Sequence, residues 1–382
     1  RMEIAKHFPH LSQPMVMGLA LWSLGMIVVR SCSLTAIADW WSCRFGQPFQ
    51  TVRERLRDTY RDAEAKAGRH RVELDLGPCW APWLNWVLEG WSGTQLAVAL
   101  DATTWGQRFV LLVISVVYRG CAVPILWKVL LAGRKHPWKP EWLTLLKAVR
   151  GSVPPTWTVI VLADRGLYAK WLFQGIRHLG WHPLLRVNAG GTFQPAGWHH
   201  RYPLTHWVPT VGRRWQGRGT AFGARRARLD CTLLAYWGEG HQAPWLLLTD
   251  LPPQVADACW YGLRAWIEQG FKKIKGGGWQ WHHTRMTDPW LAIAIATWWL
   301  LAVGGEAEAA IPIATFPSVP GSPRPQGRCW RLVGVFRHGW SLIMAALFNH
   351  QPLPLGHGCP EPWPAVPISP DILSLPMLED ET

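Results

Sequence analysis

Five short apolar segments constrain the fold of this chain more than any other feature of its sequence. Several of them are rich in β-branched residues, as strands usually are. They lie at residues 96–101, 109–118, 123–130, 157–163 and 183–187. The first three follow closely on one another, and Arg119-Gly120 is a turn signal between the second and the third, so we expect them to pair antiparallel. A helical pattern precedes each of the last two segments, and the order βββαβαβ predicts an α/β fold around a mixed sheet.

The flanking segments differ in composition from these strands. Residues 1–92 have helical patterns, beginning with an apolar stretch at 11–29. Residues 188–250 are rich in Gly, Arg, His and Trp and contain short strand patterns, which predicts a β-rich insertion. Helices are expected next at 254–275 and 289–305. We therefore expect a ribonuclease-H-like mixed sheet, in the order βββαβ-β-insertion-α, with an all-α N-terminal region and a β-rich insertion.

These changes of pattern predict where the parts of the chain begin and end. A Pro-rich stretch precedes the last helical pattern, and the C-terminal tail combines many prolines with acidic residues, a composition typical of disorder. The expected parts are a helical N-terminal bundle at 1–92, the first half of the core at 93–187, the Arg- and Trp-rich insertion at 188–250, the second half of the core at 251–310, a linker and C-terminal helix at 311–350, and a disordered tail at 351–382.

The charge balance narrows the class of partner. Lys and Arg number 39 against 25 Asp and Glu, which gives a net charge of +14. Such an excess favours a polyanion, either nucleic acid or an anionic membrane surface. Apolar residues make up 49% of the chain, which excludes a chain that is disordered along its whole length. The 8 cysteines contain no CxxC pair, which argues against a zinc ribbon or a disulfide scaffold and favours reduced thiols.

Two uncharged apolar runs approach the length of a membrane span, at 11–29 and 289–305. The first is interrupted early by Ser12, Gln13 and Pro14. The second follows a highly charged predicted helix, and a sheet could bury its Trp-rich face. We therefore predict that both runs form buried helices and that the protein has no membrane partner.

Three carboxylates stand out by their positions. Asp101 ends the first predicted strand, Asp164 ends the fourth, and Glu268 lies within the helix expected after the insertion. In a sheet of this order the first and fourth strands are central neighbours, and their carboxyl ends open onto one crevice. Carboxylates that share a crevice repel one another unless cations lie between them, and oxygen ligands suit Mg²⁺ or Mn²⁺. Two such ions could clamp the attacking and leaving oxygens of a phosphodiester.

The helix expected around Glu268 carries further charged residues on one face. Tyr261, Arg264, Glu268 and Lys275 follow one another at offsets of 3, 4 and 7, which return to nearly the same side of a helix. A carboxylate between two cations and a phenol suits metal binding beside a phosphate backbone. The simpler alternative is a solvated Arg–Glu pair on an exposed helix face.

The same residues resemble a known family. The spacing Y-(2)-R-(3)-E-(6)-K from Tyr261 to Lys275 is similar to the signature of DDE transposases of the insertion-sequence-four type. Asp164-Arg165-Gly166-Leu167-Tyr168 resembles the motif around that family's second Asp, and Val98-Ala99-Leu100-Asp101-Ala102-Thr103 resembles its first-Asp strand. The resemblance covers about 95–305, and the long gap from Asp164 to Glu268 suits a family that inserts a β-rich domain there.

The resemblance implies a function and a set of site residues. Asp101, Asp164 and Glu268 would be the catalytic, metal-binding triad, holding two Mg²⁺ or Mn²⁺ ions. The residues that would contact DNA or support the site are Tyr261, Arg264, Lys275 and Arg165. The protein would cut and join the ends of an insertion sequence by phosphodiester hydrolysis and transesterification. It would act on double-stranded DNA, both transposon ends and target, as a homodimer in the bacterial cytoplasm at the nucleoid.

The insertion supplies further candidates for DNA contact. Its arginines are expected to form a DNA-facing cluster, because acidic residues are scarce around them. The cluster comprises Arg213, Arg214, Arg218, Arg225, Arg226 and Arg228. Some members of the family stack a flipped base on a Trp of the insertion. The candidates for that role are Trp198, Trp207, Trp215, Trp237 and Trp245.

Three other interpretations stay open at this point. The chain could be a DNA-binding relic that no longer cuts, which a start at Arg1 instead of Met favours and the intact acids oppose. It could be a membrane protein that uses its two apolar runs. It could also be a non-specific nuclease on a ribonuclease-H-like fold, although the arginine-rich insertion favours a defined DNA end.

Overall fold

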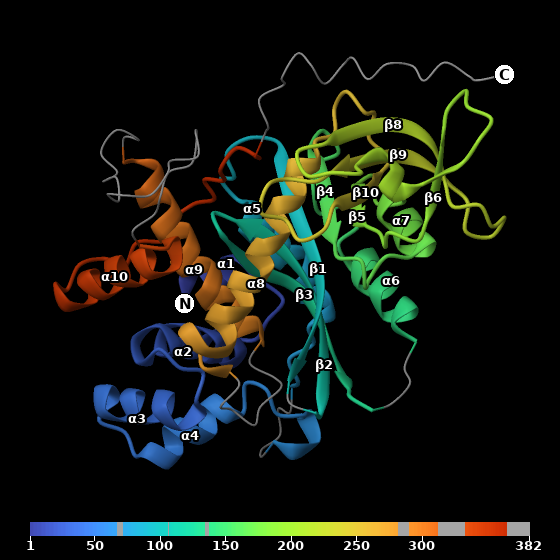
Figure 1. The fold of residues 1–382 in the computed structure, drawn as a ribbon. Helices are drawn as coiled ribbons and strands as arrows, with labels where there is room; N and C mark the ends of the chain where they lie inside the picture. Colours follow the sequence, from blue (N-terminus) through green and yellow to red (C-terminus); the bar gives the residue numbers. More distant parts are fainter. Residues whose placement is uncertain (67–71, 106, 134–136, 282–289, 312–332, 365–382) are drawn as a thin grey trace.

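The structure, a computed structural model, is a mixed α/β protein with one large mixed sheet and helices packed around it (Figure 1). It describes residues 1–66, 72–105, 107–133, 137–281, 290–311 and 333–364. The sheet has 10 strands in the order β3-β2-β1-β4-β5-β10-β9-β8-β6-β7. The prediction of an α/β fold on a mixed sheet is confirmed, and β1 and β4 are central neighbours as expected.

The first half of the sheet comes from the five predicted apolar segments. Its strands are β1 (Gln95–Trp105), β2 (Phe109–Tyr118), β3 (Cys121–Leu131), β4 (Thr158–Ala163) and β5 (His182–Arg186). β1 pairs antiparallel with β2 and parallel with β4, and β5 pairs parallel with β4. Arg119 and Gly120 form the tight β2–β3 turn, both at positive φ, which matches the right-handed twist of a hairpin. The side chains of the central strands are almost fully buried, so this half of the sheet forms the centre of the core.

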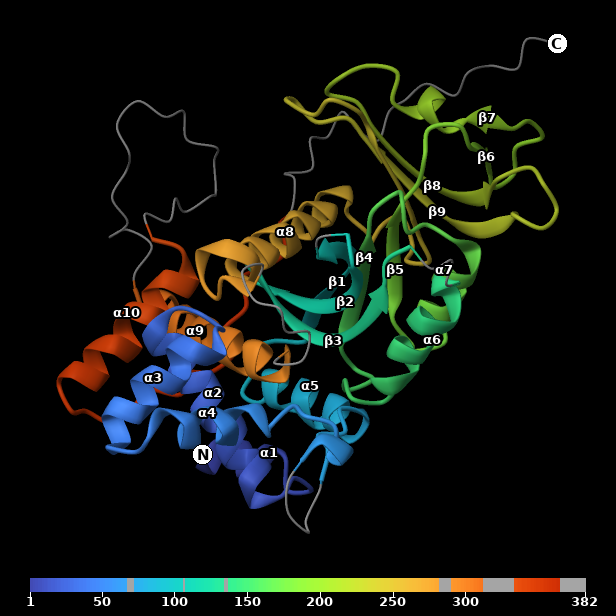
Figure 2. The same cartoon turned by 90° about the horizontal axis from the view of Figure 1, so that it is seen from below.

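The insertion continues the same sheet. Its strands are β6 (Thr192–Pro195), β7 (Tyr202–Pro203), β8 (Arg214–Ala221), β9 (Leu229–Tyr236) and β10 (Trp245–Thr249), with a short 3₁₀ turn η3 at Leu204–Trp207. β10 pairs antiparallel with β5, and β9, β8 and β6 follow in turn. The insertion is therefore joined to the core through backbone hydrogen bonds, and it projects from one end of the sheet (Figures 1 and 2).

Helices cover both faces of the central strands. α6 (Trp138–Ala148) and α7 (Lys170–Arg177) contact each other and lie on one side. α8 (Ala265–Lys272) and α9 (Trp290–Ala309) lie on the other side, where α8 packs on β2 and β3 and α9 packs on β3 (Figure 2). Gly270 permits this close packing, because a Cβ there would lie 3.0 Å from the Ala122 carbonyl oxygen of β3. α8 is thereby fixed beside the central strands.

Residues 1–92 are mainly helical, as predicted, with shorter elements than the sequence pattern indicated. They form α1 (Met2–His7), α2 (Gln13–Val29), α3 (Leu34–Phe45), α4 (Phe49–Arg57) and α5 (Trp80–Leu88), with short 3₁₀ turns η1 (Ala63–Ala65) and η2 (Gly77–Cys79). α4 ends at Arg57. The amides of Thr59 and Tyr60 there bond to carbonyls three residues back, which tightens and closes the helix.

The single helix expected over 254–275 is wrong in its extent and type. A 3₁₀ helix η4 (Ala258–Arg264), the α-helix α8 and a π-helix η5 (Lys273–Gly277) follow one another without a break. The Asp257 side chain accepts a hydrogen bond from the Cys259 amide at 2.7 Å and so caps the first turn after the prolines at 252 and 253. At the other end Gly278 lies against Phe336, so the glycine run lets the chain pass close to the C-terminal helix α10 (Val335–Phe348).

α9 is an internal helix of the protein. It is long and apolar enough to cross a membrane by length and composition, and 83% of that stretch is buried within the protein. α2 and α3 pass the same test together but are bent by 97° at the break between them. α9 packs against α2, α10 and β3. This packing agrees with the prediction that both apolar runs form buried helices.

The expectation of a disordered tail over 351–382 is wrong for its first part, residues 351–364. This segment, which we call the C-terminal strap, has no regular secondary structure but crosses the core. The Trp299 indole donates to the Pro354 carbonyl oxygen at 2.7 Å, and the Cys359 amide donates to the Tyr118 hydroxyl at 3.0 Å. Trp363 then meets Trp260 of η4 edge to face, with the ring centres 4.8 Å apart. Residues 365–382, and residues 312–332 of the part predicted as a linker and C-terminal helix at 311–350, lie outside the described residues.

The contact between α9 and α10 depends on Gly304 of α9 and Gly339 of α10, which face each other's backbone. A Cβ at Gly339 would overlap the Leu300 carbonyl oxygen, which is backbone and cannot move aside. Gly339→Ala is therefore expected to lower the free energy of unfolding by about 1–3 kcal/mol, measured by chemical denaturation. Gly334→Ala is the matched control, because Gly334 begins the same helix with φ −64 and open space around its Cα. Equal losses in the two variants would contradict the packing.

Candidate active site

Two of the predicted acids lie side by side because their strands pair in parallel. The last paired residues of β1 and β4 are Leu100 and Ala163, and Asp101 and Asp164 follow them directly. The side chain of Asp101 is 18% exposed and that of Asp164 is 41% exposed, so the crevice opens to solvent on the Asp164 side. The sheet edge predicted to collect the ligands of the site thus carries both acids.

Backbone amides fix how these two carboxylates are turned. The Ala102 amide donates to Asp101 Oδ1 at 2.9 Å. The amides of Gly166 and Leu167 donate to Asp164 Oδ1 at 3.0 and 3.2 Å, which forms an Asx turn after β4. One oxygen of each carboxylate is therefore held by the backbone. The other, Oδ2, faces the space between the strands and α8.

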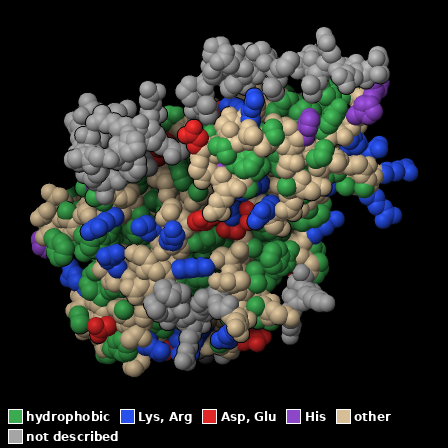
Figure 3. Space-filling view, in the orientation of Figure 1, with side chains coloured by type: hydrophobic (Ala, Val, Ile, Leu, Met, Phe, Trp, Pro, Cys, Tyr) green, Lys and Arg blue, Asp and Glu red, His purple; other side chains and the backbone are tan. Residues whose placement is uncertain are grey.

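Arg264 lies in that space and meets all three predicted acids. Its Nη2 atom is 3.6 Å from Asp101 Oδ2 and 3.6 Å from Asp164 Oδ2, and its Nη1 atom donates to Glu268 Oε1 at 2.6 Å. The Glu268 side chain is 56% exposed and completes the solvent side of the cluster. Figure 3 shows acidic side chains gathered near the middle of this face, with basic side chains around them. The structure thus brings the three acids to one place.

The electrostatics of the cluster follow from its burial. Burial raises the pKa of the Asp101 carboxyl, and the nearby charges of Asp164 and Glu268 add to that rise, while Arg264 opposes it. Burial by itself would lower the pKa of the Arg264 guanidinium, but the surrounding carboxylates outweigh it and the pKa is raised. Arg264 therefore stays charged and balances part of a negative charge that water screens poorly.

Lys275 lies at the same edge of the sheet. Its ammonium donates to Thr103 Oγ1 at 2.6 Å. Lys275 belongs to the π-helix η5, whereas the sequence pattern placed it on an α-helix. Burial lowers the Lys275 pKa, and the charge of Asp101 opposes this. Sequence reasoning missed Thr103. The signal for it was the period of two in β1, which puts residues 101 and 103 on the same face of the strand.

The prediction that Tyr261 contacts DNA does not agree with its position. Tyr261 is 5% exposed and packs edge to face against Trp245, with the ring centres 5.2 Å apart. Burial raises the pKa of its hydroxyl to about 12, and the Arg264 and Arg186 guanidinium groups oppose the rise. The 3₁₀ turn of η4 changes the direction of this side chain relative to α8, so Tyr261 anchors the helix to the insertion instead of facing outward.

The donor chemistry of the three acids suits a divalent cation. Three carboxylates supply only oxygen donors, the ligands that Mg²⁺ and Mn²⁺ prefer. In the part of the chain that the structure describes, no group of three His, Cys, Asp or Glu side chains is arranged to hold a metal ion. The free oxygens of Asp101 and Asp164 instead both face the guanidinium of Arg264.

The arginines proposed as a DNA-facing cluster divide into two groups. The exposed group comprises Arg213, Arg218, Arg225, Arg226 and Arg228, and Arg165 beside the second acid is exposed as well. Arg214 is 12% exposed and pairs with Asp257, the cap of η4, at 3.3 Å. Its position does not support a DNA contact, because its charge is paired with Asp257 and joins β8 to the start of η4.

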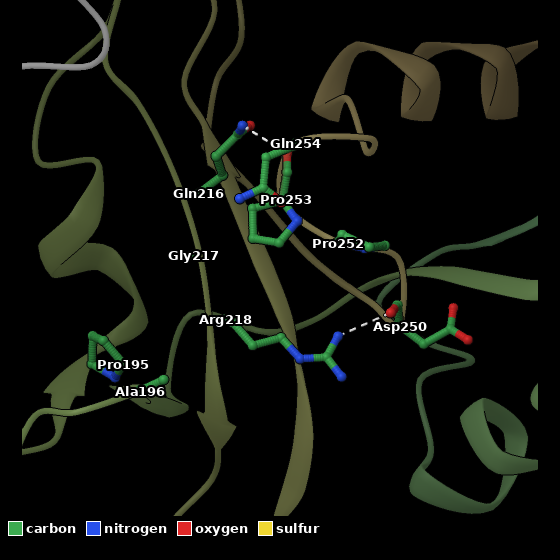
Figure 4. Close-up of a pocket in the computed structure, with 9 residues that line it drawn as sticks. All are labelled: Pro195, Ala196, Gln216, Gly217, Arg218, Asp250, Pro252, Pro253 and Gln254. Atoms are coloured by element: carbon green, nitrogen blue, oxygen red, sulfur yellow. Dashed lines mark hydrogen bonds between the residues drawn. The ribbon is translucent and has the colours of Figure 1, made fainter.

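An open groove of about 730 Å³ runs along β8 (Figure 4). Arg218 points across it and donates to the Asp250 carbonyl oxygen at 2.9 Å, and Gln216 donates to the Pro253 carbonyl oxygen at 2.8 Å. Both bonds connect the insertion to the segment that leads into η4. The groove therefore lies between the insertion and the segment that precedes η4.

The tryptophans of the insertion are mostly engaged with other rings. Trp207 stacks on Trp215 with the ring centres 4.1 Å apart, and Trp245 stacks on His241 at 4.4 Å. The Trp237 indole donates to the His241 carbonyl oxygen at 3.0 Å. Trp198 is 38% exposed, so of the five candidates it offers the most open ring.

Comparison with known proteins supplies the family. Residues 93–303 match the family described as Transposase DDE domain, and this stretch contains all three acids. The chain belongs to that family, and with it to the proteins of DNA transposition. No curated protein matches the sequence.

Two solved structures resemble this chain weakly. One is the cryo-EM structure of a piggyBac transposase synaptic complex with hairpin DNA, at 12% identity and a TM-score of 0.39, covering 76% of this chain and 65% of that one. The chain thus spans just under two thirds of the length of that transposase. The other is the crystal structure of human ENDOV, at 12% identity and a TM-score of 0.23, covering 53% of this chain and 81% of that one. Scores this low carry no argument about function.

The buried position of Tyr261 leads to a stability test. Tyr261→Ala is expected to lower the free energy of unfolding by about 3 kcal/mol or more, because it removes a buried ring. Tyr261→Phe is expected to cost about 1 kcal/mol, because it leaves the ring and removes only the hydroxyl. Chemical denaturation measures both. If the Ala variant unfolds like the parent chain and loses only DNA affinity, the ring is a DNA contact after all.

Proposed function

We propose that this chain is an active DNA transposase of the insertion-sequence-four type, with a ribonuclease-H-like core and a catalytic triad of Asp101, Asp164 and Glu268. It cuts the ends of an insertion sequence and joins them to new DNA. One observation carries the proposal above all others. The free oxygens of Asp101 and Asp164 face the same nitrogen of Arg264, Nη2, and the other terminal nitrogen of that guanidinium, Nη1, donates to Glu268. The three acids therefore share one small space.

In the proposed reaction the triad holds divalent cations, Mg²⁺ or Mn²⁺, two in each site. The chemistry that such ions supply when bound is activation of the attacking oxygen and stabilisation of the leaving oxygen of a phosphodiester. The residues of the chain prepare the ligands. The amides of Ala102, Gly166 and Leu167 hold one oxygen of each Asp and leave the other free for the site.

The basic side chains of the site act on the DNA backbone. Arg264, among the carboxylates, and Lys275, at the same edge of the sheet, neutralise phosphates next to the cut, while Arg165 reaches phosphate from the turn after β4. Lys275 is directed there by its bond to Thr103. Arg213, Arg225 and Arg226 on the insertion contact DNA farther from the cut.

The remaining parts of the proposal rest on the resemblance of the motifs to the family. The partners are double-stranded DNA, both transposon ends and target, and the protein acts as a homodimer that holds two ends together. It works in the bacterial cytoplasm at the nucleoid. The alternative is a relic that binds DNA without cutting, and the convergence of the three acids around one cation favours the active enzyme.

The triad leads to a direct test of activity. Asp101→Asn, Asp164→Asn and Glu268→Gln are each expected to abolish Mg²⁺-dependent cleavage of DNA that carries the gene with its chromosomal flanks, because each removes a metal ligand. Binding to the same DNA should survive, as measured by gel shift. Glu239→Gln is the control, since it removes an exposed acid on the insertion. Cleavage that persists in all three variants rules out the triad, and a parent chain that binds but never cuts supports the relic.

The exposed arginines lead to a binding test. The double variant Arg225→Gln with Arg226→Gln is expected to weaken DNA binding and to reduce the slope of log affinity against log salt by about 2, because two phosphate contacts are lost. Arg214→Gln should instead lower stability with little change in that slope, because Arg214 pairs with Asp257. An unchanged slope in the double variant would remove this loop from the DNA interface.

A further inference from the structure

The position of Arg264 has a consequence for metal binding. Its guanidinium fills the space that the free oxygens of Asp101 and Asp164 share, and it also bonds to Glu268. A Mg²⁺ ion binds carboxylate oxygens at about 2.0–2.1 Å. An ion that close to both Oδ2 atoms would lie beside Arg264 Nη2, which is 3.6 Å from each of them, and the two cations would repel each other. Arg264 and a divalent ion therefore compete for the same oxygens.

Arg264 is held in this place mainly by electrostatic attraction, and few hydrogen bonds fix its guanidinium there. Only its contact with Glu268 has hydrogen-bond length, while both contacts with the aspartates are 3.6 Å. Its Nε atom is buried and has no hydrogen-bond partner in the described part of the chain. A structural arginine would normally satisfy this donor, because an unpaired buried donor costs free energy. The guanidinium can thus leave the acids if another anion receives it.

DNA supplies such an anion. A phosphate at the solvent side of the site, where Glu268 is 56% exposed, can take the guanidinium in a bidentate contact. Once Arg264 turns to the phosphate, the carboxylates lose their counter-charge and repel one another until divalent ions bind. Because linkage is reciprocal, metal bound between the acids in turn favours the DNA-bound position of Arg264.

We propose that Arg264 is a cationic placeholder that occupies the metal site of the DNA-free protein and gives way to divalent ions when a DNA phosphate receives its guanidinium. Metal loading is thereby coupled to DNA engagement, which keeps the free protein from carrying a loaded catalytic centre. This inference rests on the proposed function, because it takes the three acids as the metal ligands.

The test measures metal binding without any cleavage step. Mn²⁺ binding to the full chain, followed by electron paramagnetic resonance of the free ion and without DNA, is compared for the parent chain, Arg264→Gln and Arg150→Gln. Arg264→Gln is expected to bind Mn²⁺ on the order of 10-fold more tightly than the parent, within the usual range of coupling between two sites. Arg150→Gln removes the same charge from the exposed turn after α6 and should bind like the parent. Adding DNA should tighten Mn²⁺ binding to the parent and leave Arg264→Gln nearly unchanged.

Equal Mn²⁺ affinities in the parent and Arg264→Gln would overturn the placeholder. Asp101→Asn combined with Arg264→Gln shows whether the acids are the ligands, because it should weaken Mn²⁺ binding again. If it does not, or if no variant binds Mn²⁺ even with DNA, the proposed function fails first. If Arg264→Gln does not fold by circular dichroism, Arg264→Lys replaces it. A lysine ammonium cannot span three carboxylates, so that variant should also bind Mn²⁺ more tightly than the parent, and parent-like binding would overturn the placeholder.

Discussion

Parallel pairing between β1 and β4 is the constraint on which the rest of this structure depends. The register that ends at Leu100 and Ala163 puts Asp101 and Asp164 next to each other at the carboxyl edge of the sheet. Neighbouring strands lie about 4.8 Å apart, so two acids in these positions must share one electrostatic environment. The Asx turn after β4 and the amide after Asp101 then leave one oxygen of each acid facing the same space.

The third acid is brought there by packing between segments distant in sequence. Gly270 lets α8 lie close on β3, and Asp257, paired with Arg214 of the insertion, fixes where the helix begins. Trp363 of the C-terminal strap meets η4 from the other side through Trp260. The element that carries Arg264 and Glu268 is therefore supported by the core, the insertion and the C-terminal strap together.

Because the insertion and the core form one sheet, the site and the basic surfaces are mechanically joined. β10 pairs with β5, and the bonds of Arg218 and Gln216 cross the groove to the segment that precedes η4. The start of η4, and with it the position of Arg264, is therefore tied to the insertion.

The local sequence pattern was enough to predict the strands, their order along the chain and which three acids come together. The five apolar segments correspond closely to β1 to β5. Asp164 follows β4, Glu268 shares a helical spacing with cations, and Asp101 lies within β1, directly after the part of β1 that pairs with β4. Tertiary structure alone decided that Tyr261 is buried, that Arg214 pairs with Asp257 instead of facing outward, that the first part of the proline-rich tail packs as a strap, and that Arg264 stands between the acids. The physical reason is that burial and ion pairing depend on partners far away in the chain. The sequence of one segment shows which side chains share a face of a strand or helix, but not which other segment of the chain packs against that face.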